Sequence, residues 1–312
     1  MPRQLRLQYP GAIYHVMNRG DRREAIFKDD RDHRLYLETL GQACEKTGWE
    51  VHAWCLMGNH FHLVIETPQA NLVAGMKWLL GTYTARFNRR HKLFGHLFGG
   101  RYKALAVDGS GSGYLRTVCD YVHLNPIRAG VLGARQSLED YRWSSFNDYL
   151  KGPGRRPVWL RTDRLFGEMG IGANNAAGRR QFEEQMEARR AQDQGQEWRK
   201  IRRGWCLGGG SFRLALLERM EGQFKEHHGG AQRQESAEKR AERMITEGLA
   251  NAGWNPGDLH KHRKGDPVKV ALAMRLRQET TLTLKWIAQR LHMGRWEYVR
   301  RLIYETRNGK SS

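Results

Sequence analysis

Stretches of alternating apolar and polar positions are interspersed with stretches of helical spacing in the first 125 residues. The strand-like stretches are residues 12–17, 49–56, 60–66 and 101–107. Helical spacing covers residues 29 to about 47, 71 to about 90, and 114–124, and Pro126 stops the last of these helices. The order β-α-β-β-α-β predicts an α+β, ferredoxin-like domain with an antiparallel sheet. Helices on one face would leave the other face of that sheet free for a ligand.

The pattern changes after Trp143. The sequence KGPGRRP at 151–157 is typical of a linker. We therefore expect one domain over residues 1–150 and a basic, mainly helical region over residues 151–312. The last segment, residues 281–305, contains two helical stretches broken at Met293 and Gly294, which fits a helix-turn-helix.

Charge narrows the choice of partner. The net charge of the 312 residues is +20. Residues 1–150 hold 20 Lys and Arg against 14 Asp and Glu, a net of +6, so residues 151–312 carry the remaining +14. Such an excess suits a polyanion, most simply nucleic acid, with a merely solubilising surface as the alternative. The chain has no long apolar run and no CxxC among its four cysteines, so we expect a cytoplasmic protein without membrane or disulfide framework.

Two histidines stand out in the strand 60–66, HFHLVIE. His60 and His62 are two residues apart and would share one face of the sheet, with Phe61 on the other. Two neutral imidazoles in this arrangement can bind one metal ion, or they can simply be packed in the sheet. The pair alone does not decide between these interpretations.

The helix at 114–124 offers a second set of candidates. Tyr121 and Asn125 are four residues apart and lie on one helical face. A phenol, with an ordinary pKa near 10, is a weak nucleophile, but beside a divalent cation it can attack a phosphate. The amide oxygen of Asn125 could complete a metal shell with His60 and His62, a mixed N/O set that suits Mg²⁺ or Mn²⁺. The plain alternative is a core tyrosine and a residue at a helix end.

Taken together, these motifs resemble a known family. His60-Phe61-His62 is similar to the HUH motif, in which U is a bulky apolar residue, and Tyr121 with Asn125 is similar to the tyrosine helix of single-tyrosine HUH transposases. The nearest resemblance is to REP-associated tyrosine transposases, relatives of the transposases of IS200/IS605-type elements. It covers roughly residues 8–150, through YPGAIYHVMNRGDRREAIF, WCLMGNHFHLVIETP, GRYKALAV and YVHLNPIRAGVL.

The resemblance implies a metal-dependent endonuclease and strand transferase acting on single-stranded DNA. Tyr121 would attack the scissile phosphate and form a 5′-phosphotyrosine link, while His60, His62 and Asn125 would hold Mg²⁺ or Mn²⁺. The insertion-sequence relatives carry Gln where this chain has the shorter Asn125. Two competitors stay open: Tyr114, seven residues before Tyr121, as nucleophile, and His123 as ligand, although it points away from Tyr121.

The family's targets are REP-like hairpins, so the resemblance implies a single-stranded or hairpin DNA partner. The protein would act as a monomer or a homodimer. The residues that we expect to contact DNA are Arg19, Arg22, Arg23, Arg101, Lys103, Arg295, Arg300 and Arg301. Two other functions compete: a non-catalytic DNA-binding regulator that uses the helix-turn-helix, and a replication initiator of the same chemistry. The second would usually bring a helicase domain, and the chain has no GxxxxGK[ST] motif.

Overall fold

The structure is a computed structural model that describes residues 7–133, 135–192, 198, 201, 204–226 and 232–307. The chain folds into two compact units, residues 1–225 and 226–312, which we call unit 1 and unit 2.

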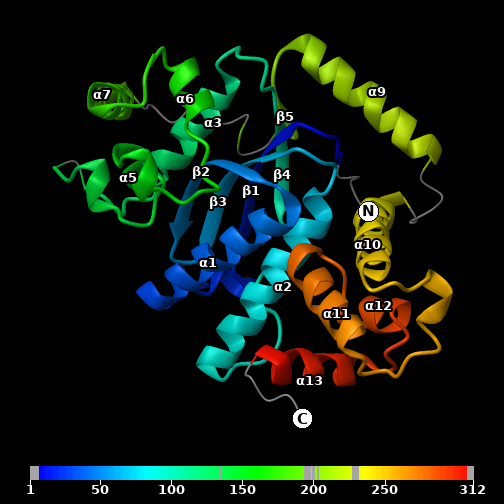
Figure 1. The fold of residues 1–312 in the computed structure, drawn as a ribbon. Helices are drawn as coiled ribbons and strands as arrows, with labels where there is room; N and C mark the ends of the chain where they lie inside the picture. The colour runs from blue at the N-terminus through cyan, green and yellow to red at the C-terminus, as the bar shows by residue number, and fades with distance from the viewer. Residues whose placement is uncertain are drawn as a thin grey trace. The chain divides into compact units, whose positions relative to one another are not determined.

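Unit 1 is built on a sheet whose strands follow the order β2-β3-β1-β4-β5 (Figure 1). The strands are β1 (Ala12–Arg19), β2 (Glu50–Met57), β3 (His60–Thr67), β4 (Lys103–Val107) and β5 (Cys206–Leu207). The first four pair antiparallel, and with helices α1 (Asp30–Thr47) and α2 (Leu72–His91) they form the expected β-α-β-β-α-β order. The predicted α+β, ferredoxin-like fold is therefore confirmed. The short strand β5 adds a parallel edge that the sequence did not predict.

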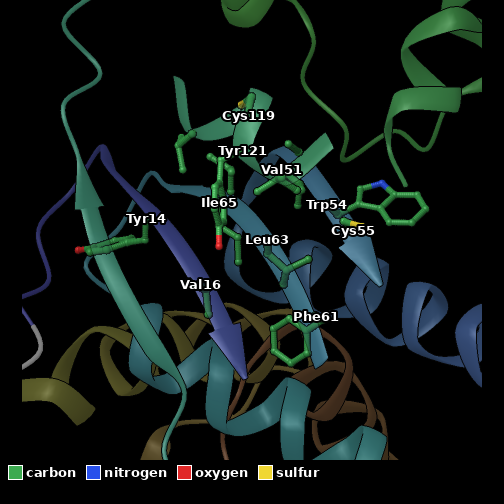
Figure 2. Packing of buried hydrophobic residues seen from close by; sticks show 14 of the residues in the cluster. Tyr14, Val16, Val51, Trp54, Cys55, Phe61, Leu63, Ile65, Cys119 and Tyr121 are labelled. Carbon is green, nitrogen blue, oxygen red and sulfur yellow. The ribbon is translucent and has the colours of Figure 1, made fainter. Parts of the chain in front are cut away.

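Helices α1 and α2 pack together against one face of the sheet. Asp29 begins α1, because its carboxylate accepts hydrogen bonds from the backbone N–H groups of Arg31 and Asp32. Phe61 of β3 points into this layer, and its ring centroid lies 5.1 Å from that of Tyr36 in α1. Figure 2 shows Phe61 directed toward the helices and Tyr121 approaching the strands from the other side. This layer forms part of the apolar core of unit 1.

The opposite face of the sheet is not free, contrary to the expectation from the sequence. Helix α3 (Tyr114–His123) packs against β2 and β3 there. The physical reason is the apolar side of α3, whose residues Leu115, Val118 and Val122 are completely buried. A one-turn helix, α4 (Asn125–Arg128), follows a break at Leu124, so Pro126 lies in the first turn of a new helix and ends the previous one.

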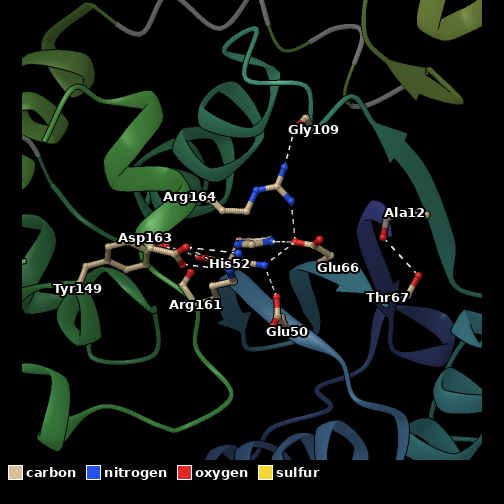
Figure 3. A network of polar contacts seen from close by, with 10 residues as sticks. All are labelled: Ala12, Glu50, His52, Glu66, Thr67, Gly109, Tyr149, Arg161, Asp163 and Arg164. Carbon is tan, nitrogen blue, oxygen red and sulfur yellow. Dashed lines mark hydrogen bonds and ion pairs between the residues drawn. The ribbon is translucent and has the colours of Figure 1, made fainter. Parts of the chain in front are cut away.

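Unit 1 continues well beyond the boundary at residue 150 that the sequence suggested. The backbone N–H of Arg161 donates to the carbonyl of Val51 in β2. Figure 3 shows how the side chains of Arg161 and Arg164 also reach Glu66 of β3, at 3.4 and 2.7 Å, beside His52 at 3.0 Å. Residues 151–157, expected to be a linker, thus lead into a segment tied to the sheet. In the described residues of unit 1, further α-helices are α5 (Phe146–Leu150), α6 (Asp163–Glu168), α7 (Ala176–Gln192) and α9 (Gly210–Glu226).

Unit 2 is helical, as expected for the end of the chain. Its helices are α10 (Gln232–Asn251), α11 (Pro267–Glu279), α12 (Leu284–Arg290) and α13 (Trp296–Arg307). A separate apolar core joins them. The break expected at Met293 and Gly294 lies between α12 and α13. Within the parts of both units that the structure describes, no helix is both long and apolar enough to cross a membrane.

Candidate active site

The two histidines of β3 lie on the sheet face that α3 covers. Their ring centroids are 5.1 Å apart, and the ring planes are nearly perpendicular. His62 is buried, whereas His60, the first residue of the strand, is partly exposed. Strand alternation therefore brings both imidazoles to one face, with one of them at the rim.

Each histidine has a partner for its Nδ1 atom. Nδ1 of His62 is hydrogen bonded to Nε2 of His15 on β1, at 2.9 Å. Nδ1 of His60 is hydrogen bonded to Oδ1 of Asn59, at 2.8 Å. A partner on one ring nitrogen fixes the orientation of the imidazole and leaves Nε2 as the atom that can bind a cation.

Tyr121 reaches the same place from α3. Its ring lies edge-on to both buried imidazoles, with centroid distances of 5.7 Å to His62 and 5.5 Å to His15. Figure 2 shows the side chain extending from its helix toward the strands. The phenol and the histidine pair, which are about 60 residues apart in the sequence, are thus neighbours in space.

Two side chains cover Tyr121, so that only 7% of it is exposed. The guanidinium carbon of Arg128 lies 4.1 Å from the centroid of the Tyr121 ring, and the same guanidinium group donates a hydrogen bond to the Tyr121 carbonyl. The completely buried ring of Trp198 lies 5.6 Å from it. The guanidinium of Arg128 places a fixed positive charge beside the phenol.

Asn125 is the fourth predicted residue of the site, beside His60, His62 and Tyr121. Its side chain lies within hydrogen-bonding reach of the His60 imidazole and acts to raise the pKa of that ring, against the larger lowering caused by burial. The residue is buried at the first turn of α4. The break between α3 and α4 therefore holds an amide beside His60 while Tyr121 lies near His62.

The imidazoles of the site are neutral near pH 7. Burial lowers the pKa of His60 to about 4, and the positive charge of Arg19 is a second cause. Burial also lowers the pKa of His62 well below its usual value, and the neighbouring His15 lowers it further. A neutral imidazole has a free lone pair, which is the form that binds metal.

The two competing residues lie elsewhere. Tyr114 is the first residue of α3, two turns before Tyr121, and is partly buried against the apolar core of unit 1. His123 lies on the other side of the helix, where its Nε2 is hydrogen bonded to Oγ of Ser145 at 2.8 Å and its ring contacts Tyr149. His123 is therefore a packed histidine that does not join the His60 and His62 pair.

The basic residues expected to contact DNA in unit 1 gather at one end of the sheet. Arg19 is the strand partner of His60, and Lys103 is that of Met17 on the histidine face. Arg22 and Arg23 form the turn that the side-chain amide of Asn59 reaches. These side chains and Arg101 are exposed, and none of them pairs with an acidic side chain in the described part of the chain. The remaining candidates, Arg295, Arg300 and Arg301, are exposed residues of unit 2.

The chain thus combines a split β-α-β-β-α-β fold with a histidine pair on the sheet and a tyrosine on α3, the helix that follows the fourth strand. A family model described as "Transposase IS200 like" matches residues 8–125, so the predicted resemblance is confirmed for this part of the chain. The chain is also similar to a solved structure described as a REP-associated tyrosine transposase bound to a REP hairpin. The identity is 16%, the match covers 53% of this chain and 93% of that chain, and the TM-score is 0.40. No curated protein matches the chain.

IS200-like transposases are generally dependent on a divalent metal. In the residues that the structure describes, no group of three or more His, Cys, Asp or Glu side chains could hold a metal ion. The donor set present is instead His60, His62 and the amide of Asn125. Two neutral imidazoles and one amide oxygen fit Mg²⁺ or Mn²⁺ if water and a substrate phosphate supply the other ligands, as is usual for these ions.

Sequence reasoning missed His15, Arg128 and Trp198. His15 occupies an alternate position of a predicted strand, but only the register, in which Met17 faces His62, brings it beside the pair. Arg128 lies seven residues after Tyr121, a spacing of two helical turns that could have pointed to it. Trp198 follows a long charged segment and carries no local signal.

Proposed function

We propose that the protein is a metal-dependent endonuclease and strand transferase that acts on single-stranded DNA carrying REP-like hairpins. The observation that carries the proposal is the neighbourhood of Tyr121 and His62, with Asn125 beside His60. These residues bring together a nucleophile and a set of cation ligands on one sheet face.

Tyr121 is the nucleophile of the proposed reaction. Its phenol oxygen forms a bond to the scissile phosphorus, and the bond from phosphorus to the 3′ oxygen breaks. The upstream strand leaves with a 3′-OH, and the downstream strand stays attached to the protein through its 5′ phosphate. The phenol loses a proton and the 3′ oxygen gains one, so the step is balanced.

His60, His62 and Asn125 would hold the cation. When bound, Mg²⁺ or Mn²⁺ withdraws charge from the phosphate and lowers the barrier to attack. His15 and Asn59 keep the two imidazoles in position through their Nδ1 atoms. A 3′-OH then attacks the phosphotyrosine, which restores a phosphodiester and the free phenol without an external energy source.

The exposed basic end of the sheet is the proposed DNA path in unit 1. Arg19, Arg22, Arg23, Arg101 and Lys103 lie around the strand ends next to His60. Cations without acidic partners are suited to phosphate contacts, which position a nucleic acid without reading its sequence.

Covalent attachment tests the proposal directly. Purified protein is incubated with Mn²⁺ and a labelled hairpin oligonucleotide that has a single-stranded 5′ flank, and adducts are resolved on a denaturing gel. We expect an adduct for the wild-type protein and for Tyr114→Phe, and none for Tyr121→Phe, which still binds the hairpin. An adduct in Tyr121→Phe, or its loss in Tyr114→Phe alone, would show that the nucleophile is another residue. A wild-type protein that binds but never reacts would favour the non-catalytic regulator.

A further inference from the structure

Unit 2 contains a basic cleft that the proposed reaction does not use. The cleft, which we call the unit 2 cleft, has a volume of about 560 Å³ and lies between the loop after η4 (Pro256–Asp258) and the turn that joins α12 to α13. Its polar lining consists of His260, His262, Arg263, Lys264, Gln289 and His292. Five of these six side chains are cationic or can become so.

A buried lysine joins the two walls of the unit 2 cleft. Lys269 of α11 is completely buried, and its Nζ donates to the carbonyls of His262, at 3.0 Å, and His292, at 3.4 Å. One wall is the loop and the other is the interhelical turn. Because a buried ammonium needs these carbonyls, it fixes the separation of the walls. The cleft is therefore a built feature of the unit.

Two arginines of unit 2 away from the cleft are neutralised by acidic partners, whereas, among the described residues, the cations at the unit 2 cleft are not. Arg275 and Arg290 are paired with Glu247 and Glu242. By contrast, Arg263, Lys264 and Arg295 have no acidic partner in the described part of the chain. Two acidic groups lie nearby: Asp258, which pairs with Lys261 at 2.9 Å, and Asp266, which lies 3.8 Å from His262. Across residues 255–307, twelve Lys and Arg face five Asp and Glu, a net charge of +7.

Helix α13, next to the unit 2 cleft, presents a stripe of side chains to solvent. Val299 and Ile303 face the core of unit 2, whereas Trp296, Arg300 and Tyr304 follow each other at i, i+4 and i+8 on the outer side. Trp296 is 41% exposed and Tyr304 is 68% exposed. Large aromatic side chains at regular spacing with an arginine between them are typical of a binding surface.

The turn between α12 and α13 brings the cleft and the stripe together. Gly294 has a φ of 85°, a conformation that glycine adopts at little cost. A Cβ at this position would lie 3.3 Å from Cδ of Lys264, so the lysine stem lies against the turn. Lys264 is therefore held close to the residue at which α13 begins.

We propose that unit 2 binds double-stranded DNA, with backbone phosphates in the unit 2 cleft and the outer stripe of α13 in the major groove. This inference rests on the proposed function only for the class of ligand, DNA. A helix with one exposed side after a short turn fits a groove about 12 Å wide, and cations beside that turn contact the backbone at its edge. The duplex is either the stem of a hairpin or double-stranded DNA beside it.

Charge removal at the unit 2 cleft tests the inference in the full-length protein. Fluorescence anisotropy measures the binding of a linear 24-base-pair duplex of mixed sequence, and of a hairpin oligonucleotide, at several KCl concentrations. The variant Arg263→Gln/Lys264→Gln is compared with Arg243→Gln/Arg275→Gln, which removes the same charge from two arginines that contact Glu247. We expect the cleft variant to lose about tenfold or more in duplex affinity, and its slope of log K against log[salt] to fall by about 2.

A third variant separates the stripe from the cleft. Trp296→Ala lowers duplex affinity but leaves the salt slope unchanged, because no phosphate contact is removed. If the cleft variant loses affinity for both the hairpin and the linear duplex, the hairpin stem is the ligand. If it loses affinity for the linear duplex alone, the ligand is flanking DNA. Equal behaviour of the cleft variant and its control, or an unchanged slope, would overturn the proposal. Adduct formation by Tyr121 is scored separately, so a chain with duplex binding but no adduct contradicts only the proposed reaction.

Discussion

Nε2 of His15 lies 2.9 Å from Nδ1 of His62, and this hydrogen bond joins two neighbouring strands behind the proposed cation site. If Nε2 of His62 offers its lone pair to a cation, Nδ1 of His62 carries the proton. This N–H group then donates the hydrogen bond to Nε2 of His15. The bond therefore selects the tautomer and the ring orientation of His62. His15 is a positioning residue in this scheme, since it touches the ligand and not the substrate.

Removal of the His15 acceptor tests this role. We expect His15→Leu to require roughly 10- to 100-fold more Mn²⁺ for half-maximal adduct formation, whereas His15→Gln, whose amide oxygen reaches a similar position, retains most of the wild-type affinity. Electron paramagnetic resonance of free and bound Mn²⁺ measures the same affinity without the reaction.

Met17→Leu is the matched control for His15, because Met17 lies one strand step away on the same face and is the strand partner of His62. It should leave the Mn²⁺ requirement unchanged. If His15→Leu is folded and binds Mn²⁺ as the wild-type protein does, the hydrogen bond to His62 has no part in holding the cation.

Asn125 is a proposed cation ligand, and the insertion-sequence enzymes that this chain resembles carry the longer Gln at this position. In the structure the side chain reaches His60. We expect Asn125→Ala to slow adduct formation about tenfold or more at limiting Mn²⁺ and to recover in part at high Mn²⁺. Asn125→Gln should keep the Mn²⁺ dependence but lose about 1–3 kcal/mol of stability, since the added methylene enters a buried position.

Adduct rates over a Mn²⁺ series and urea unfolding separate these two effects. Glu139→Gln, a change at an exposed residue of η2 (Leu138–Asp140), serves as the control for both measurements. An Asn125→Ala protein with a wild-type Mn²⁺ requirement would remove Asn125 from the cation shell.

Local patterns in the sequence were sufficient for much of the fold. Strand alternation around His60 and His62, and the helical spacing from residue 29 to about 47, depend on neighbours within a few residues. These features follow from rules of spacing, and the structure agrees with them.

Long-range contacts were beyond such reasoning. His15 meets His62 only because of the strand register, and Trp198 reaches Tyr121 across about 75 residues of sequence. The sequence also did not indicate that α3 covers the second face of the sheet, because the apolar side of a helix does not reveal which surface it packs against. The extent of unit 1 was missed because KGPGRRP has the composition of a linker, while the anchor is the later segment around Arg161.

The segment around Arg161 is tied to Glu66 of β3, whose carboxylate contacts three side chains (Figure 3). His52 lies at 3.0 Å and Arg164 at 2.7 Å, with Arg161 farther away at 3.4 Å. Burial by itself would raise the pKa of Glu66, but the hydrogen bonds from His52 and Arg164 outweigh it and hold the pKa at about 2. Glu66 is thus ionised over a wider range of pH in the folded chain than in the unfolded one.

The sign of the pH dependence follows from this lowered pKa. Above pH 4.5, the usual pKa of the carboxyl group, Glu66 contributes its full stabilisation, and the contribution is lost as the pH falls from about 4.5 to about 2. A shift of this size corresponds to about 3 kcal/mol.

We expect Glu66→Gln to be less stable than the wild-type protein by about that amount at pH 6, with a difference that shrinks toward pH 3. Urea unfolding at pH steps between 3 and 6 measures it. Glu50→Gln removes a more exposed partner of Arg161 and should cost less than about 1 kcal/mol. A Glu66→Gln deficit that stays constant across this range would mean that its ion pairs do not anchor residues 161–164 to the sheet.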